Sequence, residues 1–262
     1  MPELEQIRAQ LFSLGDKERA KKSKEYLKSP YEFYGMKVPE MRKIMKEYKN
    51  LEFYSALNLF DGLWKSGNHE EMNCALALLP YYINNHQIEV WKFLLERLDR
   101  AKSWDLIDDL STHILGKILD ERIDLMSEVK KLSESRNSWF RRTSIVSTLP
   151  LIKKNKIELT LRLAEKLVYD DDVYVQKGAG WMLREAGKKN RFVVREFILT
   201  KLDMKPSAFS YATEKMTELR KIKRQKMKSL AILSKSQNKE FIKKQKEKLK
   251  EENKNEQTGN FE

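Results

Sequence analysis

Cysteine, glycine, proline and histidine are scarce in this 262-residue sequence, and each shortage excludes a class of structure or chemistry. The single cysteine, Cys74, cannot form an internal disulfide and indicates a reducing compartment. Nine glycines and six prolines are too few for an architecture of short strands and turns. The three histidines have no metal-ligand spacing and Cys74 has no evident base partner, so zinc and thiol catalysis are not expected.

Long apolar runs and targeting segments are also missing. No stretch approaches the roughly 18 apolar residues that a membrane span needs. The N-terminus, MPELEQIRAQ, lacks the charged and apolar regions of a signal peptide. We therefore expect a cytoplasmic protein without a membrane partner. The sequence contains neither a P-loop nor a dinucleotide-binding fingerprint, so no nucleotide cofactor is expected.

Charge is abundant, and it is mostly positive. Charged residues make up 35% of the chain and the net charge is +13, which indicates a polyanionic partner, nucleic acid first. Residues 221–262 carry 13 basic and 6 acidic side chains, a surplus of 7. About half of the excess therefore lies on a Lys-rich C-terminal tail. We expect a folded domain over 1–220 and this tail over 221–262; the tail's charge also fits a solvated helix that aids solubility.

Apolar residues recur at helical spacing along nearly the whole chain, and no segment alternates as a strand would. Helices are expected to begin near Asn68, Ser103, Ser138 and Asp172. These starts are 35, 35 and 34 residues apart, and a period of this length holding two helices is typical of a helical solenoid. The second helices of such an array line one concave surface. We therefore expect an all-α protein with a basic groove suited to a duplex.

Trp104 and Asp108 lie four residues apart in SWDLIDDL (103–110). At about 100° per residue, Asp108 is about 40° from Trp104 and at the edge of the apolar face, whereas Asp105 and Asp109 are expected on the solvent side. A carboxylate beside a tryptophan is partly shielded from water, so its charge acts more strongly there. The pattern equally fits a tryptophan at the edge of the core with an aspartate bonded to a neighbouring helix.

Two later stretches combine cations with aromatic residues. In NSWFRRTS (137–144), Asn137 or Ser138 would cap a helix, and one of Arg141 and Arg142 could bind phosphate while the other pairs with an acidic neighbour. Surface ion pairs would explain the same residues.

In VYVQKGAGWMLREAGKK (173–189), one helix face carries a stripe of three cations and a tryptophan, a pattern typical of nucleic-acid contact: Lys177, Trp181, Arg184 and Lys188. Packing around a buried tryptophan is the alternative. Gly178 and Gly180 each cost about 1 kcal/mol of helix propensity, so we expect a close approach to this backbone.

Five stretches together resemble the AlkD-type family of DNA alkylation repair glycosylases over roughly residues 5–217. They are YGMKVPEMRKI (34–44), SWDLIDDL (103–110), NSWFRRTSI (137–145), VQKGAGWMLREAGK (175–188) and YATEKM (211–216). The resemblance implies a right-handed α-solenoid of HEAT-like repeats. It also implies hydrolysis of the N-glycosidic bond of N3- and N7-alkylated purines in double-stranded DNA, without metal or cofactor. The lesion would stay in the base stack, and the protein would act as a monomer associated with the nucleoid.

The resemblance also implies roles for individual residues. Asp108 matches the catalytic carboxylate, and Trp104 and Trp181 match the aromatic walls at the lesion. Arg142 matches a phosphate-binding arginine and Tyr26 an N-terminal aromatic residue near the lesion. Arg184 matches a position with a phosphate-binding or structural role. The sequence departs from the family where members often carry arginine and this chain has Pro206 and Ser210. The alternative to an enzyme is a non-catalytic helical-repeat protein that binds nucleic acid or protein.

Overall fold

The computed structural model describes residues 1–258, with the side chains of residue 236 and of those beyond 245 left aside. Within these residues the regular structure is helical, apart from one isolated bridge between Glu32 and Asn68. The predicted all-α fold is therefore confirmed. Its right-handed, concave form stays a prediction. The chain divides after Glu214 into two compact units, so the first unit ends before the predicted boundary at 220.

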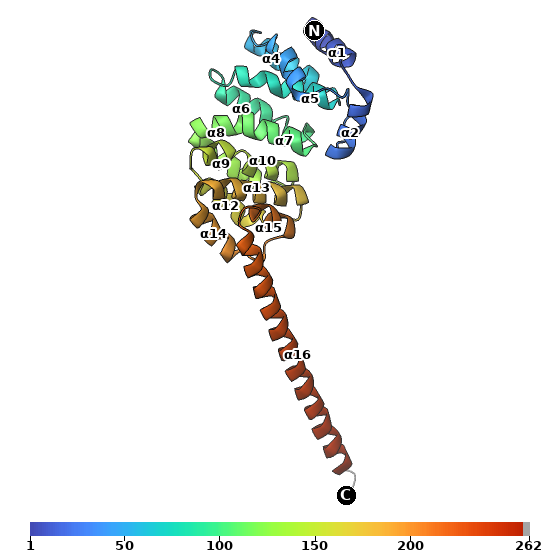
Figure 1. Cartoon of the computed structure of the whole chain (residues 1–262), viewed down its shortest axis with the longest axis vertical. Coiled ribbons are helices and arrows are strands. Elements are labelled where there is room, and N and C mark those ends of the chain that lie inside the picture. The colour runs from blue at the N-terminus through green and yellow to red at the C-terminus, as the bar shows by residue number, and fades with distance from the viewer. Residues whose placement is uncertain (259–262) are drawn as a thin grey trace. The chain divides into compact units, whose positions relative to one another are not determined.

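The first unit holds fifteen numbered α-helices, several of them joined by short 3₁₀ turns (Figure 1). Its N-terminal part contains α1 (Pro2–Ser13), α2 (Lys17–Leu27), α3 (Val38–Lys46), α4 (Phe53–Trp64), α5 (His69–Leu78) and α6 (Gln87–Leu95). Its middle contains α7 (Trp104–Leu110), α8 (Gly116–Glu121), α9 (Met126–Ser133), α10 (Ser138–Val146) and α11 (Leu149–Lys153). It closes with α12 (Glu158–Leu167), α13 (Val173–Lys189), α14 (Arg191–Thr200) and α15 (Pro206–Ala212).

The predicted helix starts are confirmed, and their caps give the physical reason. The N-cap residues of α5, α7, α10 and α13 are Asn68, Ser103, Asn137 and Asp172. The side chains of Asn68, Asn137 and Asp172 accept hydrogen bonds from backbone N–H groups of the first turn, which have no partner inside the helix. The hydroxyl of Ser103 instead donates to Asp105. The helices of this unit stack in chain order, so equivalent positions of successive repeats lie near each other (Figure 1).

The tryptophans separate into two groups by burial. Trp64 and Trp91 are 2% and 1% exposed and belong to the core. Each has a partner for its indole N–H, the carbonyl of Arg97 and the carboxylate of Glu128. Trp104, Trp139 and Trp181 are only half-buried. Because large aromatic side chains gain most from full burial, these three are the candidates for a functional surface.

The expected close approach to the backbone of α13 at Gly178 and Gly180 is confirmed. A Cβ at Gly180 would lie 2.5 Å from the carbonyl oxygen of Ala208, on α15. A Cβ at Gly178 would lie 3.2 Å from Nη1 of Arg142. The neighbours that approach this backbone are therefore the chain's own helices, and one of them delivers a predicted site residue.

The second unit contains α16 (Thr217–Thr258), a helix of 42 residues. Among its described side chains, those beyond residue 223 are exposed, including Met227, Leu230 and Phe241. The last four residues of the predicted tail, 259–262, lie outside the described residues. Across the described part of the chain, no helix combines the length and the apolar character needed to cross a bilayer.

Candidate nucleic-acid site

A cavity of about 410 Å³ in the first unit brings together seven of the eight predicted site residues. They come from four helices that lie far apart in the sequence: Tyr26, Trp104, Asp108, Arg142, Lys177, Trp181 and Arg184. The eighth, Lys188, does not line the cavity; its ammonium pairs with Glu185 at 2.7 Å. A volume of this size is within the range of small-molecule pockets and can hold one nucleotide-sized group.

Asp108 is held by a bidentate ion pair with Arg142. Nε and Nη2 of Arg142 lie 2.9 and 2.8 Å from the two carboxylate oxygens. Nη1 of the same guanidinium donates to the carbonyl of Tyr174. The side chains of Arg142 and Asp108 are 6% and 15% exposed, so the pair is largely removed from water. A fork-shaped guanidinium fixes both oxygens at once, and it therefore sets the orientation of the carboxylate in the cavity.

Burial and the positive charge of Arg142 shift the pKa of Asp108 in opposite directions. Burial raises the pKa of its carboxyl above the usual value, and the Arg142 guanidinium offsets part of that rise. The negative charges of Asp105 and Asp109 raise the pKa further. A π-helical turn, Ser111–Leu115, follows α7, and its Thr112 hydroxyl donates to the Asp108 carbonyl at 2.7 Å. Turns of this kind occur often at functional sites.

The predicted solvent positions of Asp105 and Asp109 are wrong. Their side chains are 24% and 26% exposed and line a smaller cavity of about 180 Å³. Oδ2 of Asp105 lies 2.8 Å from Nε2 of His69, which belongs to α5. Burial tends to raise the pKa of Asp105, but the contacts with His69 and Ser103 outweigh it and the pKa is lowered. The helical pattern of α7 alone does not reveal the neighbouring helix that covers this side.

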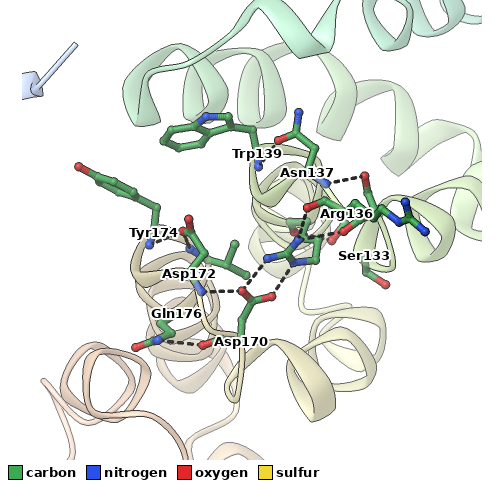
Figure 2. A network of polar contacts seen from close by, with 12 residues as sticks. Ser133, Arg136, Asn137, Trp139, Asp170, Asp172, Tyr174 and Gln176 are labelled. Carbon is green, nitrogen blue, oxygen red and sulfur yellow. Dashed lines mark hydrogen bonds and ion pairs between the residues drawn. The ribbon is translucent and has the colours of Figure 1, made fainter. Parts of the chain in front are cut away.

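The consecutive arginines of α10 both pair with aspartates. Arg141 binds Asp170 through Nε and Nη2, at 2.6 and 2.8 Å, and Arg142 binds Asp108. Figure 2 shows the network around Asp170, which also accepts from the backbone N–H of Asp172. The expectation that one of the two arginines pairs with an acidic neighbour is therefore confirmed. A phosphate contact of Arg142 stays a prediction.

The cavity walls are aromatic and basic. The rings of Tyr26 and Trp104 meet edge to face, with centroids 6.1 Å apart. Tyr26 lies in the last turn of α2 and is 74% exposed. Arg184 also lines the cavity, and its guanidinium pairs with Glu214 and, at 3.2 Å, with Glu185.

Three lining residues were missed: Lys28, Tyr174 and Tyr211. Lys28 ends α2 in a left-handed conformation, with a φ of 50°. Tyr174 lies 70 residues after Trp104, two repeat lengths further on, so the repeat itself could have identified it. Tyr211 begins the stretch YATEKM that carried part of the resemblance.

Among the described residues, no three His, Cys, Asp or Glu side chains lie close enough together to hold a metal ion. Cys74 is buried, and burial raises the pKa of its thiol.

Comparison with known proteins identifies the family and the fold of this chain. A family model described as "DNA alkylation repair enzyme" matches residues 7–216. The chain therefore belongs to the DNA alkylation repair enzyme family. A solved structure described as "Predicted DNA alkylation repair enzyme from Enterococcus faecalis" has the same fold, with a TM-score of 0.69 and 21% identity. The match covers 77% of this chain and 96% of that one. The search of curated protein sequences gives no significant match.

Proposed function

We propose that this protein is a monofunctional DNA glycosylase of the AlkD type. It hydrolyses the N-glycosidic bond of cationic N3- and N7-alkylated purines in double-stranded DNA and leaves an abasic site. The observation that carries the proposal is the position of the Asp108 carboxylate, which lines an aromatic cavity and is oriented by Arg142. In this proposal the protein acts as a monomer on nucleoid DNA in the cytoplasm.

The chemistry requires stabilisation of a sugar cation. An N3- or N7-alkylpurine already carries a positive charge, so the base departs as a neutral molecule when the C1′–N bond breaks and its electron pair moves to the purine. The sugar that remains is oxocarbenium-like. The ionised Asp108 carboxylate attracts this cation, and the faces of Trp104 and Trp181 add cation–π attraction. Water then adds to C1′ and releases a proton, for which Asp108 is the acceptor in the cavity.

The remaining site residues would bind the DNA backbone. Lys177 and Arg184 line the cavity beside the tryptophans and offer charged donors to phosphates. Arg142 uses one N–H of each terminal nitrogen for Asp108 and Tyr174, and the second N–H of each would reach a phosphate. Tyr26 would contact the nucleotide from α2. Lys188, outside the cavity, would contact the flanking backbone.

A non-catalytic scaffold, the alternative function, would not require Asp108 to line a cavity. If the Asp108–Arg142 pair served only to join α7 and α10, the carboxylate would not need to line a cavity. It does line one, together with Trp104 and Trp181, and this arrangement favours the enzyme.

Release of 7-methylguanine from alkylated duplex DNA tests the proposal directly. Purified wild-type protein should release the base in a single-turnover assay, and the same DNA incubated without protein under the same conditions gives the background of spontaneous release. A protein that binds alkylated duplex DNA without releasing any base would establish the scaffold instead.

A further inference from the structure

One aromatic ring occupies the same position in each of four successive repeats. His69, Trp104, Trp139 and Tyr174 are each 35 residues apart. Each is the first or second residue of its helix, in α5, α7, α10 and α13 respectively. Because the repeats stack in chain order (Figure 1), we expect these four positions to follow one another as a row along the array.

The first two rings of the row are already accounted for: His69 is buried against another ring, and Trp104 belongs to the proposed catalytic site. His69 is 5% exposed and stacks on Phe33, with centroids 4.5 Å apart and planes inclined by 19°. Trp104 lines the cavity and meets Tyr26. The row continues beyond the proposed catalytic centre, so its last two rings need a separate explanation.

Trp139 and Tyr174 form a pair at the edge of the cavity. Their ring centroids are 5.3 Å apart and their planes are inclined by 35°. Both side chains are half-buried, and Tyr174 lines the cavity whereas Trp139 lies beside it. The ammonium of Lys177 lies 5.5 Å from the Tyr174 ring centroid. Two aromatic faces with a cation beside them are the combination that holds an unpaired base and its phosphate.

The backbone beneath the pair is firmly held. The side chain of Asn137 accepts from the N–H of Trp139 at 2.9 Å, and Asp172 accepts from that of Tyr174 at 2.8 Å. Gln176 donates to the carbonyl of Asp170 at 2.8 Å. In Figure 2 both rings extend away from this polar network. A rigid base for the rings reduces the entropy lost when a ligand stacks on them.

We propose that Trp139 and Tyr174 form a stacking platform for the base that loses its partner when the alkylpurine is excised. This inference rests on the proposed function, since it assumes a DNA lesion in the adjacent cavity. The platform would stabilise the product complex by binding the orphan base, while Lys177 binds the phosphate next to it.

Two duplexes that differ only in the orphan base isolate this contact. One carries a tetrahydrofuran abasic analogue opposite 2-aminopurine, and the other carries the analogue on both strands. The full-length wild type should bind the first duplex roughly tenfold or more tightly, the size typical of stacking on an aromatic side chain. Its binding should also quench the 2-aminopurine fluorescence.

Substitutions then assign the preference to the rings. Trp139→Ala and Tyr174→Leu should each bring the ratio of the two dissociation constants toward one, and Trp139→Phe should retain part of it. Phe192→Ala is the matched control, because Phe192 is an aromatic residue of α14, 73% exposed and outside the cavity. Circular dichroism checks that each variant is folded.

Failure of the platform and failure of the glycosylase give different results. A wild type with equal affinity for both duplexes overturns the platform, even if it releases 7-methylguanine. A ratio unchanged by both substitutions overturns it as well. A clear preference for the orphan base without any release of 7-methylguanine would support the platform and contradict the glycosylase.

Discussion

Arg142 and Asp108, 34 residues apart, form a bidentate ion pair in which both carboxylate oxygens accept from one guanidinium, at 2.9 and 2.8 Å. The neighbouring Arg141 makes the same kind of pair with Asp170, away from the cavity. Helix α10 therefore supplies one ion pair in the candidate site and a second pair of the same kind outside it, which can serve as a control.

Asp108→Asn should lower the single-turnover rate of 7-methylguanine release by at least about a hundredfold, because a neutral amide cannot stabilise the sugar cation. DNA affinity should change little. Asp170→Asn breaks the matched pair and should lower the melting temperature while excision by the folded protein stays close to wild type. Equal rates for Asp108→Asn and wild type would remove Asp108 from the mechanism.

The acid limb of the pH–rate profile should reflect the raised pKa of Asp108. Protonation removes the charge that the reaction needs, so the rate should fall as the pH drops through that pKa, at a higher pH than for an ordinary aspartate. Arg142→Gln removes the guanidinium that holds the pKa down and should move the limb to still higher pH. The rates are corrected for spontaneous base loss at each pH. A flat profile down to the usual range of aspartate would contradict the assignment.

Salt dependence separates phosphate contacts from internal ion pairs. Lys177→Ala and Arg142→Ala should each reduce the slope of log K against log salt by about 0.9 on duplex DNA. Arg141→Ala should leave the slope unchanged, because Arg141 does not line the cavity. If Arg142→Ala behaves like Arg141→Ala, the role of Arg142 is confined to holding Asp108.

Gly180→Ala should destabilise the protein by roughly 1–3 kcal/mol, the usual cost of overpacking, despite the better helix propensity of alanine. The added Cβ would lie 2.5 Å from a backbone oxygen of Ala208, which cannot move aside alone. Thermal unfolding measures the effect. Gly178→Ala is the comparison, because its Cβ would meet the flexible side chain of Arg142 at 3.2 Å. That variant should lose excision more than stability.

Removing residues 221–262 should leave the melting temperature nearly unchanged, since their described side chains bury little apolar area. Affinity for undamaged DNA should fall most at low salt, where the tail's positive charge is least screened. Excision at saturating enzyme should persist. A truncated protein that binds DNA normally but no longer excises would place the tail in the active complex, as a substitute for the arginines absent at 206 and 210.

The sequence predicts those features of the fold and site that depend on local chemistry. Asn68 and Asp172 begin helices because their side chains bind the first-turn N–H groups, and this signal needs no tertiary information. The stripe of α13 follows from helical geometry, and three of its four residues line the cavity.

The helical periodicity of the sequence does not predict which side chains of different repeats contact each other. Asp105 was expected in solvent because nothing within α7 indicates that His69, 36 residues earlier, covers it. The sequence also does not show whether Arg142 pairs with Asp108 or with a DNA phosphate, since both are anions that can accept two hydrogen bonds from a guanidinium. Lys28 was missed because it follows the end of a helix, where periodicity no longer applies.

α13 carries four of the ten cavity residues on one rigid rod: Tyr174, Lys177, Trp181 and Arg184. The carboxylate sits on a different helix, α7. Lys177 and Arg184 therefore keep a fixed spacing to Trp181, whereas their position relative to Asp108 depends on α10, which packs against both α7 and α13. A substitution that tilts or shifts α13 would therefore move two aromatic rings and two cations of the cavity together, relative to the carboxylate on α7.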